Sequence, residues 1–301
     1  MVAEPLKTGE LQPGVRTLVP RHKLATRITH WINVVAFLVL LFSGLAIFNA
    51  HPALYWGQKS DFDHPWLSMS ASADAHGHLV GHTRVGGLDL HTTGVLGVSR
   101  NVYGGAPQAR GFPSWTTLPP GLDLSAGRHW HFFFAWLLVL NGLAYLVLGF
   151  WNGHLPKDLT PTRQDLRELP HEIVTHARLQ FPKDERATRY NVLQKLTYGA
   201  VVFVLFPLLI LAGLTMSPAL DAGFHLPDLL FGRQSARSLH FIAAWLIVGF
   251  LAVHLLMVVA SGTWNNLRSM ITGRYAIIPS GAPSDIPSGV TSRSEEQTHE
   301  H

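Results

Sequence analysis

Five histidines lie within or at the edges of long apolar stretches of this sequence. Two of them, His240 and His254, are 14 residues apart in a stretch without Asp, Glu, Lys or Arg. In a helix this spacing is close to four turns, so both rings would project from nearly the same face, about 21 Å apart along the axis. A neutral imidazole binds haem iron and other transition metals. The spacing therefore predicts one helix that carries metal ligands at two depths.

The absence of cysteine restricts the chemistry that such ligands could support. The chain has 18 histidines and no cysteine. This composition excludes disulfides, iron–sulfur clusters, thiolate zinc sites, a cysteine nucleophile and the C-x-x-C-H attachment of c-type haem. Any bound metal must be held by nitrogen or oxygen ligands.

Four uncharged runs would position the histidines. They are residues 28–48, 129–151, 196–216 and 238–260. Each run has about 20 residues, enough for a helix to cross the roughly 30 Å hydrocarbon layer, and the first is too long for a signal peptide. The whole chain is only 14% charged, against roughly 25% in soluble domains. We therefore predict an all-α membrane protein, a four-helix transmembrane bundle.

The basic residues predict the topology of this bundle in a bacterial cytoplasmic (inner) membrane. Five precede the first run and eight lie in 152–195, but only two lie in 217–237. Basic loops stay in the cytoplasm, so we expect segments 1–27, 152–195 and 261–301 there, and both termini with them. The net charge of +4 then needs no nucleic-acid partner.

The segments between the spans are less regular in sequence. Residues 49–128 are rich in Gly, Pro, His and Asp, without a sustained apolar period. This predicts a long irregular outer loop between the first two helices, without a large core of its own. Residues 162–179 are a helix candidate interrupted by Pro170, and the tail from about 279 is predicted to be disordered.

The topology pairs the histidines by depth. The second helix begins outside, level with His240, and its residue there is His131. The first begins inside, where His30 lies near the level of His254. A bis-histidine pair in an apolar bundle is the arrangement for b-type haem, so we predict two haems. A single histidine is more often structural or interfacial, which suits His129 and, taken singly, His30. Chance explains four matched positions poorly.

An arginine precedes three of these histidines by three residues, on the same helix face. Arg27, Arg128 and Arg237 would each lie one turn nearer water, where they could bind haem propionates. Membrane sidedness alone also explains Arg27. Gly44, 14 residues after His30, would leave room for the outer haem, although small residues also allow close helix packing. Four further glycines could serve in the same way: Gly142, Gly149, Gly213 and Gly249.

These residues resemble the dihaem membrane cytochrome b superfamily, which includes the cytochrome subunits of formate dehydrogenase, nickel–iron hydrogenase and thiosulfate reductase and the prokaryotic cytochrome b-561 class. The resemblance covers about 20–275 and is closest in 128–136, 190–195 and 233–240. It implies an outer haem on His131 and His240 and an inner haem on His30 and His254.

The resemblance also implies a quinone site beside the inner haem. Asn191 and Gln194 match the family pattern there, and both side chains could bond to a quinone carbonyl. Capping of the third helix by Asn191 is an equally good interpretation.

Filled axial positions favour electron transfer over chemistry at the metal. The resemblance implies an electron-transfer subunit between the quinone pool and a periplasmic oxidoreductase of the molybdopterin type. Whether it forms a homo-oligomer is left open.

Two alternatives rest on the outer segment. A superoxide:quinone oxidoreductase would attract its anionic substrate through the cations Lys59, Arg84, Arg100 and Arg110. A metal-binding transporter or membrane anchor would use the outer histidines, although a solvated or partner-contacting role suits them better. These histidines are His76, His78, His82 and His91.

Overall fold

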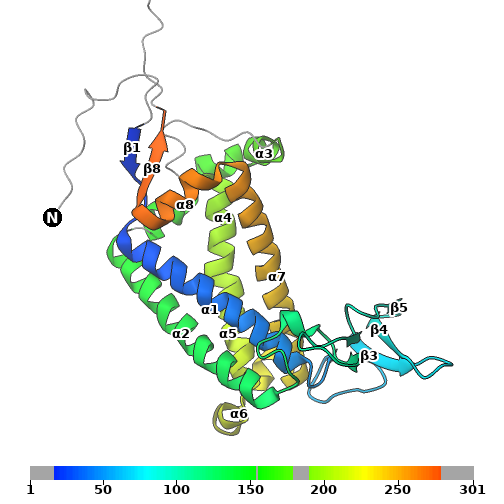
Figure 1. Ribbon diagram of the computed structural model, residues 1–301. Helices are drawn as coiled ribbons and strands as arrows, with labels where there is room; N and C mark the ends of the chain where they lie inside the picture. Colours follow the sequence, from blue (N-terminus) through cyan, green and yellow to red (C-terminus); the bar gives the residue numbers. More distant parts are fainter. Residues whose placement is uncertain (1–16, 154, 179–189, 279–301) are drawn as a thin grey trace, which may run out of the picture.

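The computed structural model describes residues 17–153, 155–178 and 190–278 of the 301. Within these ranges, four helical stretches are long and apolar enough to cross a membrane, so the four-helix fold is confirmed (Figure 1). The predicted disordered tail lies outside the described residues, as do residues 1–16 and 179–189 of the predicted cytoplasmic segments. The four stretches are α1 (Leu24–Phe48), α2 (Leu124–Trp151), α4 to α5 (Val192–Thr215) and α7 (Arg233–Ala260).

Each helix begins four or five residues before the uncharged run that predicted it, because polar side chains extend it beyond the apolar part. The Asp123 carboxylate accepts a hydrogen bond from the Ala126 amide at 2.9 Å and caps α2. Asn191 and Gln194 form a reciprocal capping box at the start of the third span. Such caps satisfy backbone N–H groups that have no partner within the helix.

The third span is not a uniform α-helix. It consists of α4 (Val192–Ala200), a π-helical turn η4 (Val201–Leu205) and α5 (Phe206–Thr215). Pro207 is the second residue after the π turn. Proline has no N–H to donate to the preceding turn, and its ring crowds the carbonyl four residues earlier. The wider π turn accommodates this interruption without ending the helix.

The bundle consists of two close helix pairs, α1 with α2 and α5 with α7. Ala36 and Leu40 pack on Leu138 in the first pair, and Leu209 packs on Ala243 and Ile247 in the second. Phe206 touches both clusters and connects the pairs. The small side chains Ala36 and Ala243 are fully buried, because small residues allow close packing of membrane helices.

The segments before the first span and after the fourth span meet at one end of the bundle. Strand β1 (Thr17–Pro20), before α1, pairs antiparallel with β8 (Arg274–Ile277), after α8 (Thr263–Thr272). We call this the inner end, following the predicted topology. Here α3 (Arg163–Ala177) contacts α4, and a π turn, η2 (Leu155–Leu159), follows α2. Helix α3 continues through Pro170, so the predicted interruption is wrong.

The opposite, outer end carries a folded unit in place of the predicted irregular loop, and this expectation is wrong. A four-stranded antiparallel sheet has the order β2-β3-β4-β5, and β6 pairs with β7. The short elements α6 and η5 lie between the third and fourth spans. The strands and remaining short helices at this end are β2 (Ala53–Leu54), β3 (Leu67–Ala73), β4 (Leu79–Val85), β5 (Leu88–His91), β6 (Val98–Ser99), β7 (Gln108–Ala109), η1 (Ser114–Thr116), α6 (Pro218–Phe224) and η5 (Leu226–Leu230).

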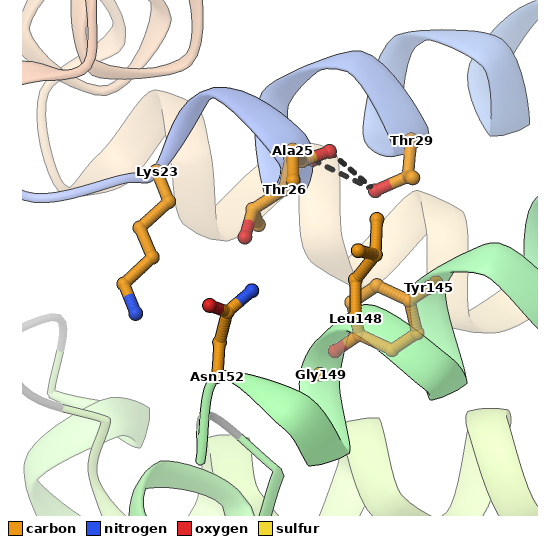
Figure 2. A pocket seen from close by; sticks show the side chains of 8 residues that line it. All are labelled: Lys23, Ala25, Thr26, Thr29, Tyr145, Leu148, Gly149 and Asn152. Carbon is orange, nitrogen blue, oxygen red and sulfur yellow. Dashed lines mark hydrogen bonds between the residues drawn. The ribbon is translucent and has the colours of Figure 1, made fainter.

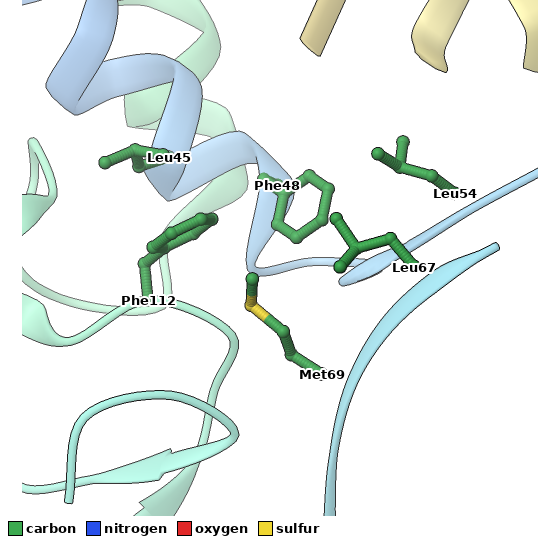
Figure 3. Close-up of a cluster of buried hydrophobic side chains, with 6 residues drawn as sticks. All are labelled: Leu45, Phe48, Leu54, Leu67, Met69 and Phe112. Atoms are coloured by element: carbon green, nitrogen blue, oxygen red, sulfur yellow. The ribbon is translucent and has the colours of Figure 1, made fainter. Parts of the chain in front are cut away.

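A small apolar core joins this outer unit to the helices. Leu67 and Met69 alternate with serines along β3, so the sheet has one apolar face. That face packs on Leu45 and Phe48 at the end of α1, together with Leu54 and Phe112 (Figure 3). The outer unit therefore shares a core with the membrane bundle instead of standing apart from it.

Candidate functional site

His131 on α2 and His240 on α7 face each other near the outer end of the bundle. Their ring centres are 6.2 Å apart, and the ring planes are inclined by 61°. A metal–imidazole bond is about 2 Å long, and each ring centre lies about 1 Å behind its nitrogen, so rings on opposite sides of one metal ion have centres roughly 6 Å apart. The observed separation fits a single six-coordinate metal between the two rings.

Hydrogen bonds fix the orientation of both rings. The Leu209 carbonyl lies 2.8 Å from Nδ1 of His240 and can only accept, so this Nδ1 carries the proton. Ser43 donates its own hydroxyl proton to the Val39 carbonyl at 2.6 Å. Its Oγ, 3.1 Å from Nδ1 of His131, therefore accepts from that ring. Both histidines are left with an unprotonated Nε2, the tautomer that metal ligation requires.

A glycine lies behind each ring of this pair. A Cβ on Gly44 would lie 3.3 Å from Cε1 of His131, and one on Gly213 would lie 3.4 Å from Cε1 of His240. Both distances are at the limit of ordinary contact. The sequence predicted that Gly44 makes room for a macrocycle, and in the structure its nearest neighbour is the imidazole. Of the other glycines proposed, Gly142 and Gly249 have no atom within 4 Å of an added Cβ, and Gly149 abuts Leu155.

The inner pair, His30 and His254, is less constrained by the protein. His30 and His254 are close enough to interact electrostatically. The Nδ1 atom of His30 is buried without a hydrogen-bond partner among the described residues. His254 stacks on Phe250, with ring centres 5.9 Å apart. A buried imidazole nitrogen without a hydrogen-bond partner lowers the stability of the folded protein. This pair therefore also fits a site completed by a metal-bearing cofactor.

The backbone next to His30 is held by a polar contact inside the bundle. The buried amide of Asn141 on α2 donates to the Thr29 carbonyl at 2.8 Å and to Asn33 Oδ1 at 2.7 Å. Between the same two helices, nearer the inner end, a cavity of about 20 Å³ lies beside Thr29 and Tyr145 (Figure 2). That volume holds a water molecule, not a quinone.

The three arginines predicted to bind propionates have different surroundings. Arg237 donates to the carbonyls of His51 and Ala53 and thereby connects α7 to the segment after α1. Arg27 donates to the Ile271 carbonyl at the end of α8. Arg128 is exposed. Two of the three therefore have structural contacts through part of their guanidinium groups, and the proposed role stays a prediction.

Asn191 and Gln194 cap α4 against each other. Asn191 Oδ1 accepts a hydrogen bond from the backbone N–H of Gln194 at 2.9 Å, and Gln194 Oε1 lies 3.4 Å from the backbone nitrogen of Asn191. The side-chain nitrogen of Asn191, Nδ2, lies 3.1 Å from Nε2 of His176 on α3. The capping interpretation thus describes the geometry, and the quinone role stays a prediction.

The outer histidines do not converge on one point. His82 contacts His91 across β4 and β5, with ring centres 5.6 Å apart, and His76 lies by His78 in the preceding turn. Within the described parts of the chain, no group of three or more histidine or acidic side chains could hold a metal ion.

Two of the four outer cations are already engaged. Arg110 is buried, donating to the Phe112 and Pro120 carbonyls at 2.9 and 3.0 Å, and burial lowers its pKa. Arg84 pairs with Asp89 and, by hydrogen bonding, holds the pKa of that carboxyl below its usual range. Lys59 and Arg100 are the exposed cations of the set without a carboxylate partner among the described residues, which weakens the case for attraction of superoxide.

The sequence did not point to Ser43 or to the Leu209 carbonyl. A signal for Ser43 exists, because a hydroxyl beside a glycine in the apolar run 28–48 is a hydrogen-bonding group at membrane depth. No sequence signal identifies a backbone carbonyl that the packing of α5 on α7 selects.

Comparison with known proteins agrees with this geometry. The prokaryotic cytochrome b561 family matches residues 21–273. A putative protein-methionine-sulfoxide reductase subunit, YedZ1 of Azospira oryzae, is 26% identical over 237 residues, covering 77% of this chain and 86% of the relative. The family match spans all four membrane helices and all four candidate ligands. The chain therefore belongs to the prokaryotic cytochrome b561 family and is a membrane protein that binds haem b.

Proposed function

We propose that this protein is a dihaem b-type cytochrome that carries electrons across the inner membrane between quinone and a periplasmic oxidoreductase. The observation that carries the proposal is the His131–His240 pair, whose rings face each other at 6.2 Å and whose Nδ1 atoms are both hydrogen bonded. His30 and His254, at the other depth, would hold the second haem.

Bound haem supplies one-electron redox chemistry, and the residues of the chain set the conditions for it. The four histidines would fill both axial positions of each iron, so no position is open for a substrate. Ser43 and Leu209 hold the outer rings in the ligating tautomer. The apolar clusters around Leu138 and Ile247 would keep water out of the region between the two haems. These features favour outer-sphere electron transfer.

The inner end offers a place for the quinone. Asn191 and Gln194 lie at the first turn of the third span, where a quinone head group would reach the bilayer surface. Capping uses one oxygen of each side chain, and the Gln194 NH2 group is still available to donate to a quinone carbonyl. Oxidation of quinol to quinone there would release two protons and pass two electrons to the inner haem.

The relative's name supports the class of partner. YedZ1 is named as a subunit of a reductase of methionine sulfoxide in proteins. By analogy, the partner here would be a periplasmic reductase of oxidised methionine with a molybdopterin cofactor. Electrons would then run outward, from quinol at the inner end to the partner at the outer end, where the folded outer unit would contact it.

Haem stoichiometry and an optical redox titration of the purified protein test this proposal. We expect two low-spin b-type haems with separate midpoint potentials, both reduced by a quinol analogue without any partner. A single haem, or zinc without iron in metal analysis, would contradict the dihaem assignment. Reduction by superoxide but not by quinol would favour the superoxide oxidoreductase instead.

A further inference from the structure

Helix α3 presents an apolar surface for which the described chain provides no cover. Figure 1 shows it end-on beside the inner ends of α4 and α7, so its axis runs across the bundle. Two side-chain contacts fix it to α4: Asp165 Oδ2 lies 2.8 Å from Lys195 Nζ, and His176 lies 3.1 Å from Asn191. The helix therefore has a defined depth and a defined orientation about its own axis.

The depth follows from Lys195. This residue directly precedes the uncharged run 196–216 that crosses the membrane. An ammonium group at the end of a span lies at the level of the lipid head groups. Because Asp165 contacts this ammonium, the first turn of α3 lies at the same level.

The side chains of α3 follow one another in order around its axis. Asp165, Leu169, Glu172 and His176, spaced four, three and four residues apart, are half-buried towards α4. About a quarter turn further round, Leu166 and Ile173 are each 50% exposed, and they form the apolar sector of α3. Val174, which is 47% exposed, lies about half a turn from the α4 side, between Arg163 and Arg167.

Two cations border this sector on the side away from α4. Arg163 and Arg167 are exposed, and neither has an acidic partner within 4.0 Å among the described residues. Beyond them lie Gln164, Glu168 and His171, which are exposed and polar. An apolar sector bordered by arginines and then by polar side chains is the pattern of helices that lie in a membrane interface.

We propose that α3 lies in the head-group layer at the inner end, with its apolar sector in the acyl boundary and Arg163 and Arg167 on the phosphates of anionic phospholipids. Charge complementarity selects this occupant, because the two free guanidinium groups match the negative lipids of the cytoplasmic leaflet. A protein partner would have to reach the same sector from within the head-group layer, where lipid already surrounds α3.

The cysteine-free chain permits a direct test with single nitroxide labels in lipid nanodiscs. Ile173→Cys places a label in the apolar sector, and the matched control Glu168→Cys places one on the polar side of the same helix. In nanodiscs with anionic lipid, we expect the label at 173 to be more accessible to oxygen than to a water-soluble nickel chelate, and the label at 168 to show the reverse. Unchanged far-UV circular dichroism would show that both variants fold.

The same label distinguishes the other occupants. Replacing anionic by zwitterionic lipid, or introducing R163Q together with R167Q, should shift the label at 173 towards the water-accessible range. Equal water accessibility at 173 and 168 in anionic nanodiscs would overturn the proposal. A label at 173 that is immobile and closed to both reagents would indicate a protein contact and overturn it too. Immersion that is insensitive to lipid charge would overturn the role of the arginines.

Discussion

The outer and inner histidine pairs differ in how completely the protein prepares them. His131 and His240 each have a partner for Nδ1 and a glycine behind the ring. In the inner pair, His30 has a buried Nδ1 without a partner among the described residues. The protein holds it indirectly, through the bonds of Asn141 to the neighbouring backbone. The protein therefore holds the outer pair in place by hydrogen bonds and packing, and it constrains the inner pair less.

Removal of one ligand from each pair should have the largest effect. We expect His131→Ala and His254→Ala each to lose about half of the haem, because each disrupts one bis-histidine site. The midpoint potential of the remaining haem shows which of the two haems, outer or inner, was lost. Haem content per polypeptide and a redox titration measure the result. Retention of two haems by either variant would contradict the assignment of that layer.

The glycine behind the His131 ring provides a second test of the difference between the two pairs. Gly44→Val adds a branched side chain where even a Cβ would lie 3.3 Å from the His131 ring. We expect the outer haem to bind about 10–100-fold more weakly, as for other changes next to metal ligands, and the inner haem to be unaffected. Gly142→Val is the control, because an added Cβ has no neighbour there. Haem loss during titration with apomyoglobin measures the effect, and equal loss from both variants would refute it.

Asn141→Leu tests the indirect support of the inner pair. It removes hydrogen bonds to Thr29 and Asn33, and interhelical hydrogen bonds in membranes contribute about 0.6 kcal/mol on average and at most about 1.7. We expect a loss of stability in this range and a shift of the inner midpoint potential alone. The lipid-facing Leu140→Ala serves as control. A shift of the outer potential of the same size would show that Asn141 acts on the whole bundle.

Ser43→Ala should produce a smaller change, confined to the outer layer. It removes one hydrogen-bond acceptor for His131, an interaction of about 0.5–1.5 kcal/mol. For a one-electron couple this corresponds to roughly 20–65 mV. We expect the outer potential to rise, because a weaker hydrogen bond makes the imidazole less electron-donating, and the inner potential to stay. Ser261→Ala, at the end of α7, is the control. An unchanged outer potential would mean that the His131 ring keeps its orientation without the hydroxyl.

The smallest effect we expect is that of acid on the attachment of α3 at the inner end. The hydrogen bond from Lys195 holds the pKa of Asp165 below its usual range near 3.8. A lowered pKa contributes stability that is fully present above the ordinary value and is lost as pH falls through the lower one. We therefore expect constant mobility of a spin label on α3 from pH 8 to 5 and loosening below about 4. Lys195→Gln should weaken the acid dependence, and a transition near neutral pH would implicate another group.

Much of the membrane region could be predicted, because its signals are local and large. Long uncharged runs gave the spans, and the 14-residue spacing placed His240 and His254 on one helix. The family match supports the cytochrome prediction. The pairing of individual histidines with haems stays a prediction, although the facing rings of His131 and His240 agree with it.

The outer sheet could not be predicted from apolar periodicity, because many of the side chains that alternate along its strands are small. In β3 the apolar face is Leu67, Met69, Ala71 and Ala73, opposite three serines. One useful signal was available: Gly86 and Gly87 join β4 to β5, and a glycine pair between strand-like runs marks a hairpin. The register of the sheet depends on packing against α1, which no local pattern contains.

The β1–β8 pairing has a consequence for biosynthesis. Strand β1 leaves the ribosome before the first span, and β8 follows the fourth, so their hydrogen bonds can form only after nearly the whole membrane region has been made. They also require both strands on one side of the membrane. A chain whose last span inserted the wrong way round would leave β8 on the opposite side from β1, with four residues of unpaired strand. The β1–β8 sheet can therefore form only when the four spans have inserted so that both strands lie on the same side of the membrane.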